Sequence, residues 1–461
     1  MSTGWQKSRL KMCNTWHRPA CALKIGHLVS IYLLTPMPDH HSLPGPEDIT
    51  RVTLANGLTV LARSNFNSPS VVVRGYLPAG GIFDPLDKLG LADFTALALT
   101  RGTAQRSFQQ IFDALESVGA GLSVDGGTHS AGFSGRALAE DVDLLLGMLS
   151  EVLRQPSFPQ EQVERLRAQL LTGLAIRAQD TAGMASLAFD ELVYPGHPYR
   201  LPLDGYPETI RAIQRDDLVT FHTQTYGPQG MVLAIVGALE PGRAVECVAG
   251  ALGDWSNPRQ VLPPGLPPTP TLLETVTRRV DIPGKSQADL LLGAVGPPRR
   301  SADYLPVSLG NSVLGQFGMS GRIGEVVREQ AGLAYYTSSS LSGGIGPGPW
   351  LISAGVEPAN LEKVIELIIN QVARFVSEPV SGEELSDSQA NYIGRLPLSF
   401  ESNAGVAGAL LNLERYGLGL DYYQRYPDLI NAITPAEVLE AVRRYLHPQR
   451  LAIAYAGSFD S

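Results

Sequence analysis

Apolar residues recur along the chain with two different spacings. The segment Val52 to Ala62, which contains an Asn-Gly pair, and the β-branched run Val71 to Leu77 have the composition of strands. Asn-Gly is a specific hairpin signal, because a type I′ turn needs positive φ at both central positions. Helical spacing follows in three segments, Leu89 to Arg101, Phe108 to Val118 and Asp141 to Arg154. Strands followed by helices predict an α+β fold, with an antiparallel sheet and helices packed on one of its faces.

The chain also contains an internal repeat. Ala212 to Gly237 and Ala432 to Gly457 align without a gap, and identical residues recur at six matching positions. In both copies a helical pattern ends at a Pro-Gln turn and leads into a short apolar strand closed by glycine. Duplication of one domain explains this pattern, so we expect two homologous domains.

A proline-rich segment lies between the two copies. Residues 258–283 contain prolines at 258, 263, 264, 267, 268, 270 and 283, a composition that favours an extended connector. The sequence therefore predicts an N-terminal domain at 43–257, a linker at 258–283 and a C-terminal domain at 284–461. A length of 461 residues is sufficient for each domain to have its own core.

Composition narrows the classes of partner. The chain is 44% hydrophobic and 18% charged, with a net charge of −9, so neither a nucleic acid nor an anionic membrane surface is expected as its main partner. Two of the three cysteines lie before residue 42, and Cys247 alone belongs to the predicted domains. This number supports neither a disulfide framework nor a cysteine-based metal site.

The first 42 residues form a distinct N-terminal extension. Up to Pro38 it carries five basic residues and no acidic one, followed by an interrupted apolar run from Ile25 to Leu34 that is too short to span a bilayer. A targeting segment and an upstream extension ahead of a true start at Met37 both remain open. We expect a soluble protein, and leave the cytoplasm and the periplasm open as its compartment.

The segment Gly90 to Thr103 reads Gly-Leu-Ala-Asp-Phe-Thr-Ala-Leu-Ala-Leu-Thr-Arg-Gly-Thr. It resembles the zinc helix of the pitrilysin/insulinase-type metallopeptidases, where Gly-x-Ala-His-Phe-x-Glu-His places two histidines on zinc and a glutamate beside the attacking water. Here the three functional positions are Asp93, Ala96 and Leu97. Alanine cannot accept the proton and leucine cannot bind the metal, so this helix is expected to have lost its zinc chemistry.

The resemblance extends to a later helix that supplies the third zinc ligand in this family, a glutamate. The equivalent segment is Val163 to Gly173, and Thr172 and Gly173 stand where the family has a pair of glutamates. All three ligands and the base are therefore missing together, and we expect no metal in this chain. Asp93 alone cannot hold a metal.

In the C-terminal half the resemblance is close at Val326 to Tyr335. This segment matches the family pattern Val-Arg-Glu-x-x-Gly-Leu-Ala-Tyr and places Arg328 and Tyr335 at the positions of the family's Arg/Tyr pair. In active relatives that pair binds the peptide backbone across the substrate chamber from the zinc and helps to stabilise the transition state. The alternative is an exposed arginine and a tyrosine that packs at the start of a strand.

Weaker candidates surround this motif. Gly315, Gly318, Gly321 and Arg322 resemble the family's glycine-rich approach to the Arg/Tyr segment, and we interpret them as substrate-binding residues, with ordinary turns as the alternative. A second cluster, 343–348, predicts a hairpin connection. His197 lies in a family stretch outside the zinc site, Tyr194 to Tyr199, for which a structural role is favoured.

Three further polar residues lack the partners that catalysis or metal binding requires. His129 and His222 have no companion at a ligand spacing, and Ser320 has no recognisable His/Asp arrangement.

The resemblance implies two functions. In the first, the chain is the non-catalytic subunit of a heterodimeric zinc peptidase, and a homologous partner with His-x-x-Glu-His carries the zinc while this chain supplies Arg328 and Tyr335 to bound peptide. In the second, it is an inactive peptide-binding or scaffold homologue that acts alone or as a homodimer. The first requires a zinc-bearing partner, and the second makes both residues dispensable.

Overall fold

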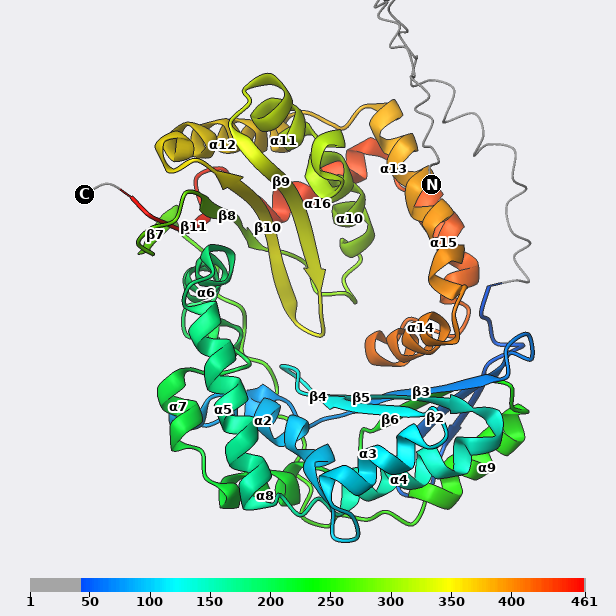
Figure 1. Cartoon of the computed structure of the whole chain (residues 1–461). Helices are drawn as coiled ribbons and strands as arrows, with labels where there is room; N and C mark the ends of the chain where they lie inside the picture. The colour runs from blue at the N-terminus through cyan, green and yellow to red at the C-terminus, as the bar shows by residue number, and fades with distance from the viewer. Residues whose placement is uncertain (1–42, 460–461) are drawn as a thin grey trace, which may run out of the picture. The chain divides into compact units, whose positions relative to one another are not determined.

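A computed structural model describes residues 43–459, which form two β-sheets with helices on their faces (Figure 1). The N-terminal extension expected at 1–42 lies outside the described residues. The first sheet has the strand order β1-β2-β6-β3-β5-β4, and the second has the order β7-β11-β8-β10-β9. The strands of the first sheet are β1 Thr50–Thr53, β2 Thr59–Ser64, β3 Ser70–Leu77, β4 Gly121–Asp125, β5 Ala131–Leu138 and β6 Val232–Gly237. Those of the second are β7 Val276–Asp281, β8 Ala288–Val295, β9 Ala334–Gly343, β10 Pro347–Val356 and β11 Ala452–Gly457.

Helices divide between the two halves. The N-terminal half contains α2 Leu91–Ala98, α3 Phe108–Glu116, α4 Val142–Arg154, α5 Gln160–Arg177, α6 Thr181–Val193, α7 Pro207–Ala212, α8 Arg215–Thr225 and α9 Pro241–Leu252. The C-terminal half contains α10 Tyr304–Asn311, α11 Arg322–Gly324, α12 Leu361–Ser377, α13 Gly382–Arg395, α14 Asn403–Tyr416, α15 Tyr422–Asn431 and α16 Pro435–Tyr445. Two π-helical turns, Ser312–Gln316 and Glu325–Gln330, flank α11.

The structure confirms the α+β fold with two homologous units. Helix α8 and strand β6 occupy the same positions in the first copy of the repeat as α16 and β11 occupy in the second. Each of these strands lies between a parallel and an antiparallel neighbour, β2 and β3 in one sheet and β7 and β8 in the other. The strand orders of the two sheets then coincide, with β1 as the additional strand of the first.

Both predicted hairpins are present. Strands β1 and β2 pair antiparallel around the Asn-Gly turn, where Gly57 has a φ of 92°. Strands β9 and β10 pair antiparallel across the glycine cluster that follows β9. The local turn chemistry was therefore sufficient to locate each hairpin, but the expected type I′ geometry of the first turn is wrong. Of the Asn56-Gly57 pair only Gly57 has a positive φ, and a type I′ turn needs it at both residues.

Each sheet is mixed, whereas the sequence predicted an antiparallel sheet. Strand β6 follows α8, lies between β2 and β3 and runs parallel to β2. Strand β11 follows α16, lies between β7 and β8 and runs parallel to β7. Strand β7 lies inside the segment 258–283 that was expected to be a linker, and residues 258–275 before it contain neither helix nor strand.

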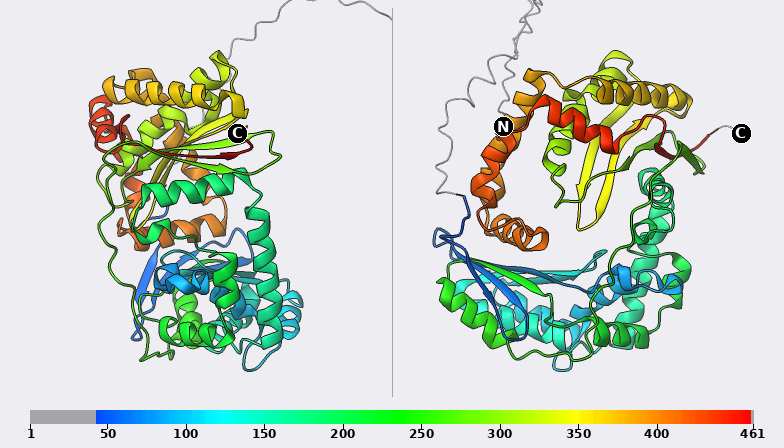
Figure 2. Two further views of the ribbon diagram at one scale, coloured as in Figure 1. Left: turned by 90° about the vertical axis from the view of Figure 1, so that its left-hand side faces the viewer. Right: turned by 180° about the vertical axis from the view of Figure 1, so that it is seen from behind.

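The second face of each sheet is covered by a helix from the other half. Helix α14 packs on β3 and β6, and helix α6 packs on β7, β8 and β11. Figures 1 and 2 show α14 on one side of the first sheet, with α3, α4 and α9 on the other side. Leu410 on α14 and Phe189 on α6 are fully buried in the resulting apolar clusters. The expected helices on one face of each sheet are present. The remaining face is covered by a helix exchange, in which α14 packs on the first sheet and α6 packs on the second.

A buried carboxylate adds a polar link to the exchange. Asp289 on β8 is 4% exposed and accepts hydrogen bonds from Thr181 at the start of α6, from Gln287 Nε2 at 2.9 Å and from the Tyr336 hydroxyl at 2.5 Å. Three donors compensate for the loss of water around this carboxylate. Asp289 thereby connects an N-terminal helix to two strands of the C-terminal sheet.

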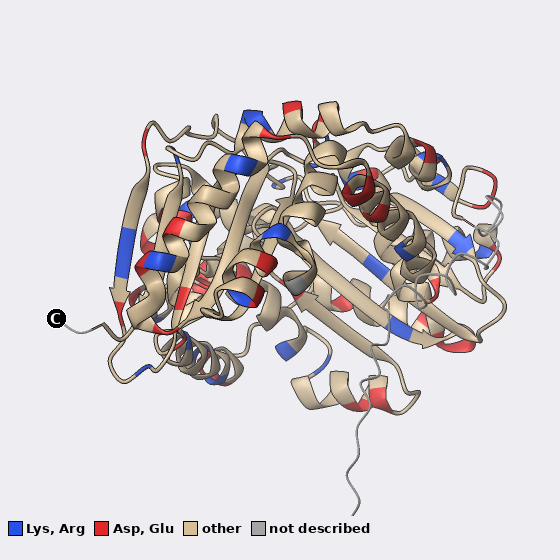
Figure 3. Cartoon of the chain, turned by 90° about the horizontal axis from the view of Figure 1, so that it is seen from above, with Lys and Arg blue, Asp and Glu red and all other residues tan. Residues whose placement is uncertain are grey.

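Charge is distributed in small groups. Figure 3 shows Lys and Arg interspersed with Asp and Glu over the helices and strands of the described chain. Within residues 43–459, no helix has the length and apolar character needed to cross a membrane.

Candidate functional site

Helix α2 contains the degenerate zinc positions and is held as part of an apolar core. Ala96 is fully buried, and Leu97 packs against the core of the first sheet. The helix begins at Gly90, whose φ of 94° reverses the chain direction, and the Asp84 carboxylate accepts hydrogen bonds from the Gly90 and Ala92 amides at 2.9 Å each. Capping therefore fixes the helix N-terminus without a metal.

The partner helix α5 also lacks a donor at the expected position. Gly173 is exposed and, as a glycine, has no side chain that could bind a metal. The two helices still contact each other, and the Arg167 guanidinium lies 5.3 Å from the centre of the Phe94 ring. The described residues contain no group of three or more His, Cys, Asp or Glu side chains able to hold a metal. The residues at these positions therefore do not fit a zinc ion.

Two acidic side chains remain near α2. Burial raises the pKa of Asp84 to about 7, although its two amide donors oppose this, and burial raises the pKa of Asp93 to about 6. Asp93 also accepts a hydrogen bond from the Gly126 amide at 3.2 Å. Asp84 thus has its partners at the start of α2, and Asp93 has its partner directly after β4. The sequence pattern identified Asp93 but missed Asp84, which caps α2 from six residues before Gly90, a spacing that matches no standard capping motif.

The two side chains of the Arg/Tyr motif are exposed, in contrast to the fully buried Ala96 of the degenerate zinc helix. Arg328 is an exposed residue of the π-helical turn Glu325–Gln330, and Tyr335 is 61% exposed at the start of β9. Within the described residues, neither side chain has a hydrogen-bond or ion-pair partner. Both polar groups are therefore available to an external ligand.

The neighbouring glycines have a packing reason as well as the predicted ligand role. A Cβ on Gly321 would lie 2.4 Å from the Gly315 Cα, and a Cβ on Gly315 would lie 3.2 Å from the Ser339 Cβ. Gly318 has a φ of 61°, a value that favours glycine. These glycines allow the loop to pass close to itself and to β9. Their contact with substrate stays a prediction.

Arg322 differs from Arg328 in already having a strong partner. Its Nε and one terminal nitrogen donate to the two Glu384 oxygens at 2.7 Å each, in the parallel geometry that suits a guanidinium and a carboxylate. This hydrogen bonding lowers the pKa of Glu384 to about 2. The ion pair holds the start of α11 against α13. To contact substrate as predicted, the Arg322 guanidinium would have to share its N–H donors between Glu384 and the substrate.

The stretch Tyr194 to Tyr199 forms contacts with the C-terminal hairpin. The Tyr194 hydroxyl donates to the Pro347 carbonyl at 3.0 Å, and the Tyr199 hydroxyl accepts from the Gly346 amide at 3.1 Å. His197 Nδ1 accepts from the Tyr199 amide at 3.1 Å, and His129 Nε2 lies 2.6 Å from the Tyr199 hydroxyl. Burial lowers the pKa of both histidines. The stretch connects the two halves of the chain.

The other two side chains considered in the sequence are His222 and Ser320. His222 Nε2 bonds the Leu153 carbonyl at 2.9 Å, and burial lowers its pKa. Ser320 is exposed in the glycine-rich loop.

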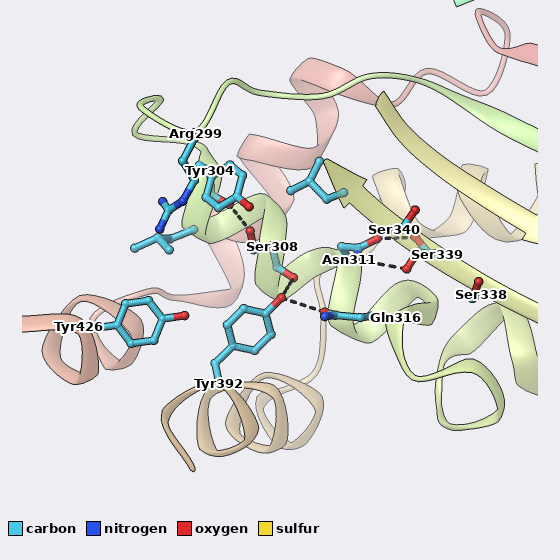
Figure 4. A pocket seen from close by; sticks show the side chains of 12 residues that line it. Arg299, Tyr304, Ser308, Asn311, Gln316, Ser338, Ser339, Ser340, Tyr392 and Tyr426 are labelled. Atoms are coloured by element: carbon cyan, nitrogen blue, oxygen red, sulfur yellow. Dashed lines mark hydrogen bonds between the residues drawn. The ribbon is translucent and has the colours of Figure 1, made fainter. Parts of the chain in front are cut away.

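Sequence reasoning missed a pocket of about 400 Å³ in the C-terminal half (Figure 4). It lies among α10, the following π-helical turn, β9, α13 and α15, and most of its lining side chains are polar. The lining residues are Arg299, Tyr304, Leu305, Ser308, Asn311, Gln316, Ser338, Ser339, Ser340, Leu341, Tyr392 and Tyr426. They come from several separate segments between Arg299 and Tyr426, so no local motif could have revealed them.

Comparisons with known proteins identify the same family in both halves. A family model described as insulinase, peptidase family M16, matches residues 59–184, and one described as peptidase M16 inactive domain matches residues 212–392. An uncharacterised zinc protease of Mycobacterium leprae is 24% identical over 90% of this chain and 92% of its own length. A Helicobacter pylori protein named non-peptidase homolog YmxG is 23% identical over 86% of this chain and 90% of its own.

The solved structures agree. A peptidase M16 inactive domain from Pseudomonas fluorescens superposes with a TM-score of 0.83 at 26% identity, covering 90% of this chain and 98% of that one. Two matching family models, the shared two-unit fold and the altered zinc helix lead to one conclusion: the chain belongs to the insulinase family of peptidases, M16, as a member whose described residues contain no zinc site.

Proposed function

We propose that the chain is the non-catalytic subunit of a heterodimeric zinc peptidase. In this proposal a homologous partner carries His-x-x-Glu-His and zinc, and the present chain supplies Arg328 and Tyr335 to the bound peptide. The observation that carries the proposal is a contrast between halves. The donors expected on α2 and α5 are missing, whereas the Arg/Tyr motif is exposed and its polar groups have no partner in the described chain.

The chemistry of the two side chains suits this division. The Arg328 guanidinium offers several fixed N–H donors to peptide carbonyl oxygens. The Tyr335 hydroxyl can donate to an oxygen on which negative charge develops. Zinc in the partner would supply the polarised water. Relatives named zinc protease support a peptidase context, and the relative named non-peptidase homolog supports a non-catalytic role.

Affinity purification of the chain from its source cells, followed by mass spectrometry, tests the partnership. We expect a homologue with His-x-x-Glu-His at roughly equal stoichiometry. Recovery of this chain alone, as a monomer or homodimer, would contradict the proposal and favour the peptide-binding or scaffold alternative.

The role of the motif is tested in the reconstituted complex. We expect Arg328→Ala to lower kcat/KM about 100-fold, the size of effect typical for loss of one transition-state donor. Zinc content and subunit stoichiometry should not change. Arg450→Ala is the matched control, because this exposed arginine lies outside the motif. Full activity of Arg328→Ala would remove the motif from the mechanism even if the partner exists.

A further inference from the structure

The pocket beside α10 has the features of a ligand site that the Arg/Tyr motif does not explain. We propose that it binds a small carboxylate, with Arg299 as the anchoring group. The pocket is open to solvent on one side and has a volume of about 400 Å³, within the range of small-molecule sites. Its occupancy is independent of zinc, of Arg328 and of Tyr335, so the proposal stands or falls separately from the peptidase function.

Arg299 is the single charged residue among those that line the pocket. Its guanidinium lies 4.4 Å from the centre of the Tyr304 ring and 5.4 Å from that of Tyr422, and one terminal nitrogen donates to the Tyr422 hydroxyl at 2.7 Å. Within residues 43–459 it forms no ion pair with a carboxylate. A half-buried cation held by aromatic faces therefore retains charge and donors for an anion.

The neighbouring Arg300 shows the difference. Its donors are directed to the Tyr416 carbonyl at 2.8 Å and the Arg415 carbonyl at 3.3 Å, and it does not line the pocket. Two adjacent arginines thus have different uses, one as a brace for the end of α14 and the other at the pocket wall.

Neutral hydroxyls complete the anion-binding character. Burial raises the pKa of Tyr304, Tyr392 and Tyr426, so these phenols keep their protons at neutral pH. The Tyr392 hydroxyl is already committed to the Ser308 carbonyl and Gln316 Oε1, at 3.0 and 2.8 Å. The Tyr426 hydroxyl has no partner within the described residues and is free to donate. Figure 4 shows Arg299, Tyr304 and Tyr426 on the same side of the pocket.

The balance of charge selects the class of ligand. No Asp or Glu lines the pocket, so a cation would meet no counter-charge there. A phosphate dianion would meet a single positive group and no lysine. A monoanionic carboxylate matches one guanidinium in charge and in planar geometry. The source of that carboxylate is either the C-terminus of a short peptide or a free organic acid.

Isothermal titration of the full chain with three probes tests the assignment: N-acetyl-Ala-Ala with a free carboxylate, the same dipeptide as its C-terminal amide, and propionate. We expect the free dipeptide acid to bind at least about tenfold more tightly than the amide. Tighter binding of the dipeptide acid than of propionate would identify a peptide end, and equal binding would identify a free acid. Equal affinity for acid and amide, or binding of neither acid, would overturn the proposal.

Variants locate the binding. Arg299→Gln should weaken the dipeptide acid at least about tenfold, and Arg300→Gln should leave its affinity unchanged. Tyr426→Phe removes one hydroxyl while keeping the ring, and should weaken binding about threefold to tenfold. This second variant keeps the test valid if Arg299→Gln unfolds. Unchanged affinity in a folded Arg299→Gln, or in Tyr426→Phe when Arg299→Gln unfolds, would overturn the site.

Discussion

The N-terminal and C-terminal halves share a strand order but treat polar groups in opposite ways. In the first half the positions of the zinc site hold Asp93, Ala96, Leu97 and Gly173. Ala96 and Leu97 join the apolar packing of α2, and the remaining carboxylate, Asp93, accepts a hydrogen bond from the Gly126 amide. In the second half Arg328, Tyr335 and Arg299 present unpaired or partly paired donors. Buried ligands without a metal would lack compensation for lost hydration, so apolar replacements stabilise the first half. The scaffold and its chemistry are therefore separable within one chain.

The two halves depend on each other at the helix exchange, where α14 covers the first sheet and α6 covers the second. Phe189→Ala and Leu410→Ala should each lower the free energy of unfolding by about 2–5 kcal/mol, because each removes a fully buried side chain from a cluster between halves. Urea unfolding measures the loss. Ile176→Ala, at a residue that is 67% exposed, is the control and should cost under about 0.5 kcal/mol. A loss under about 1 kcal/mol in both core variants would mean that the halves are stable without the exchange.

The polar link at Asp289 should contribute less than the apolar clusters. Asp289→Asn keeps the shape but gives one acceptor and an extra donor to a site built from three donors, so we expect a loss of about 1–3 kcal/mol. Asp387→Asn, at an exposed aspartate of α13, should be nearly neutral. Thermal unfolding of the two variants and the wild type measures the loss. A melting temperature of Asp289→Asn equal to that of Asp387→Asn and the wild type would show that the carboxylate is not required.

The Glu384 carboxylate predicts how the C-terminal half responds to acid. Its pKa is about 2 in the folded chain and ordinarily 4.5, so its ion pair with Arg322 stabilises the fold above about pH 5 and is lost as pH falls toward 2. The carboxylate is one-third exposed, which limits the effect to about 1–2 kcal/mol at pH 7. Glu384→Gln should show this loss at pH 7 and none near pH 2.

The exposed neighbour Glu383→Gln is the control for that measurement. A pH profile of stability that is the same in Glu384→Gln and the wild type would show that the ion pair does not affect folding.

The smallest effect is expected at the Arg/Tyr motif in the isolated chain. Arg328→Ala and Tyr335→Phe remove groups that are exposed and without partners in the described chain, so the free energy of unfolding should change by under about 0.5 kcal/mol. Chemical denaturation of the purified variants tests this. A loss above about 1.5 kcal/mol, which corresponds to more than tenfold in the folding equilibrium, would assign the pair a structural role and weaken the contrast between halves.

Sequence alone was sufficient for the features that depend on local pattern. The internal repeat predicted α8 with β6 and α16 with β11, and the Asn-Gly pair predicted the first hairpin. The sequence could not predict that α6 packs on the second sheet and α14 on the first. An apolar helix face does not specify which distant sheet it covers. Arg299 was missed for a related reason, because the fold brings the pocket residues together from separate elements. Asp84 lies only six residues before Gly90, and it was missed because this spacing matches no standard capping motif.

The exchange has a consequence for the chain as it leaves the ribosome. The first sheet has all its strands once Gly237 is made, but α14, which covers its second face, is complete only at Tyr416. At a synthesis rate of about 5–20 residues per second, the apolar face of that sheet waits roughly 10–40 s for its cover. During that interval the nascent chain exposes a surface suited to a holding chaperone, and truncation before α14 should produce an aggregating product rather than a stable half.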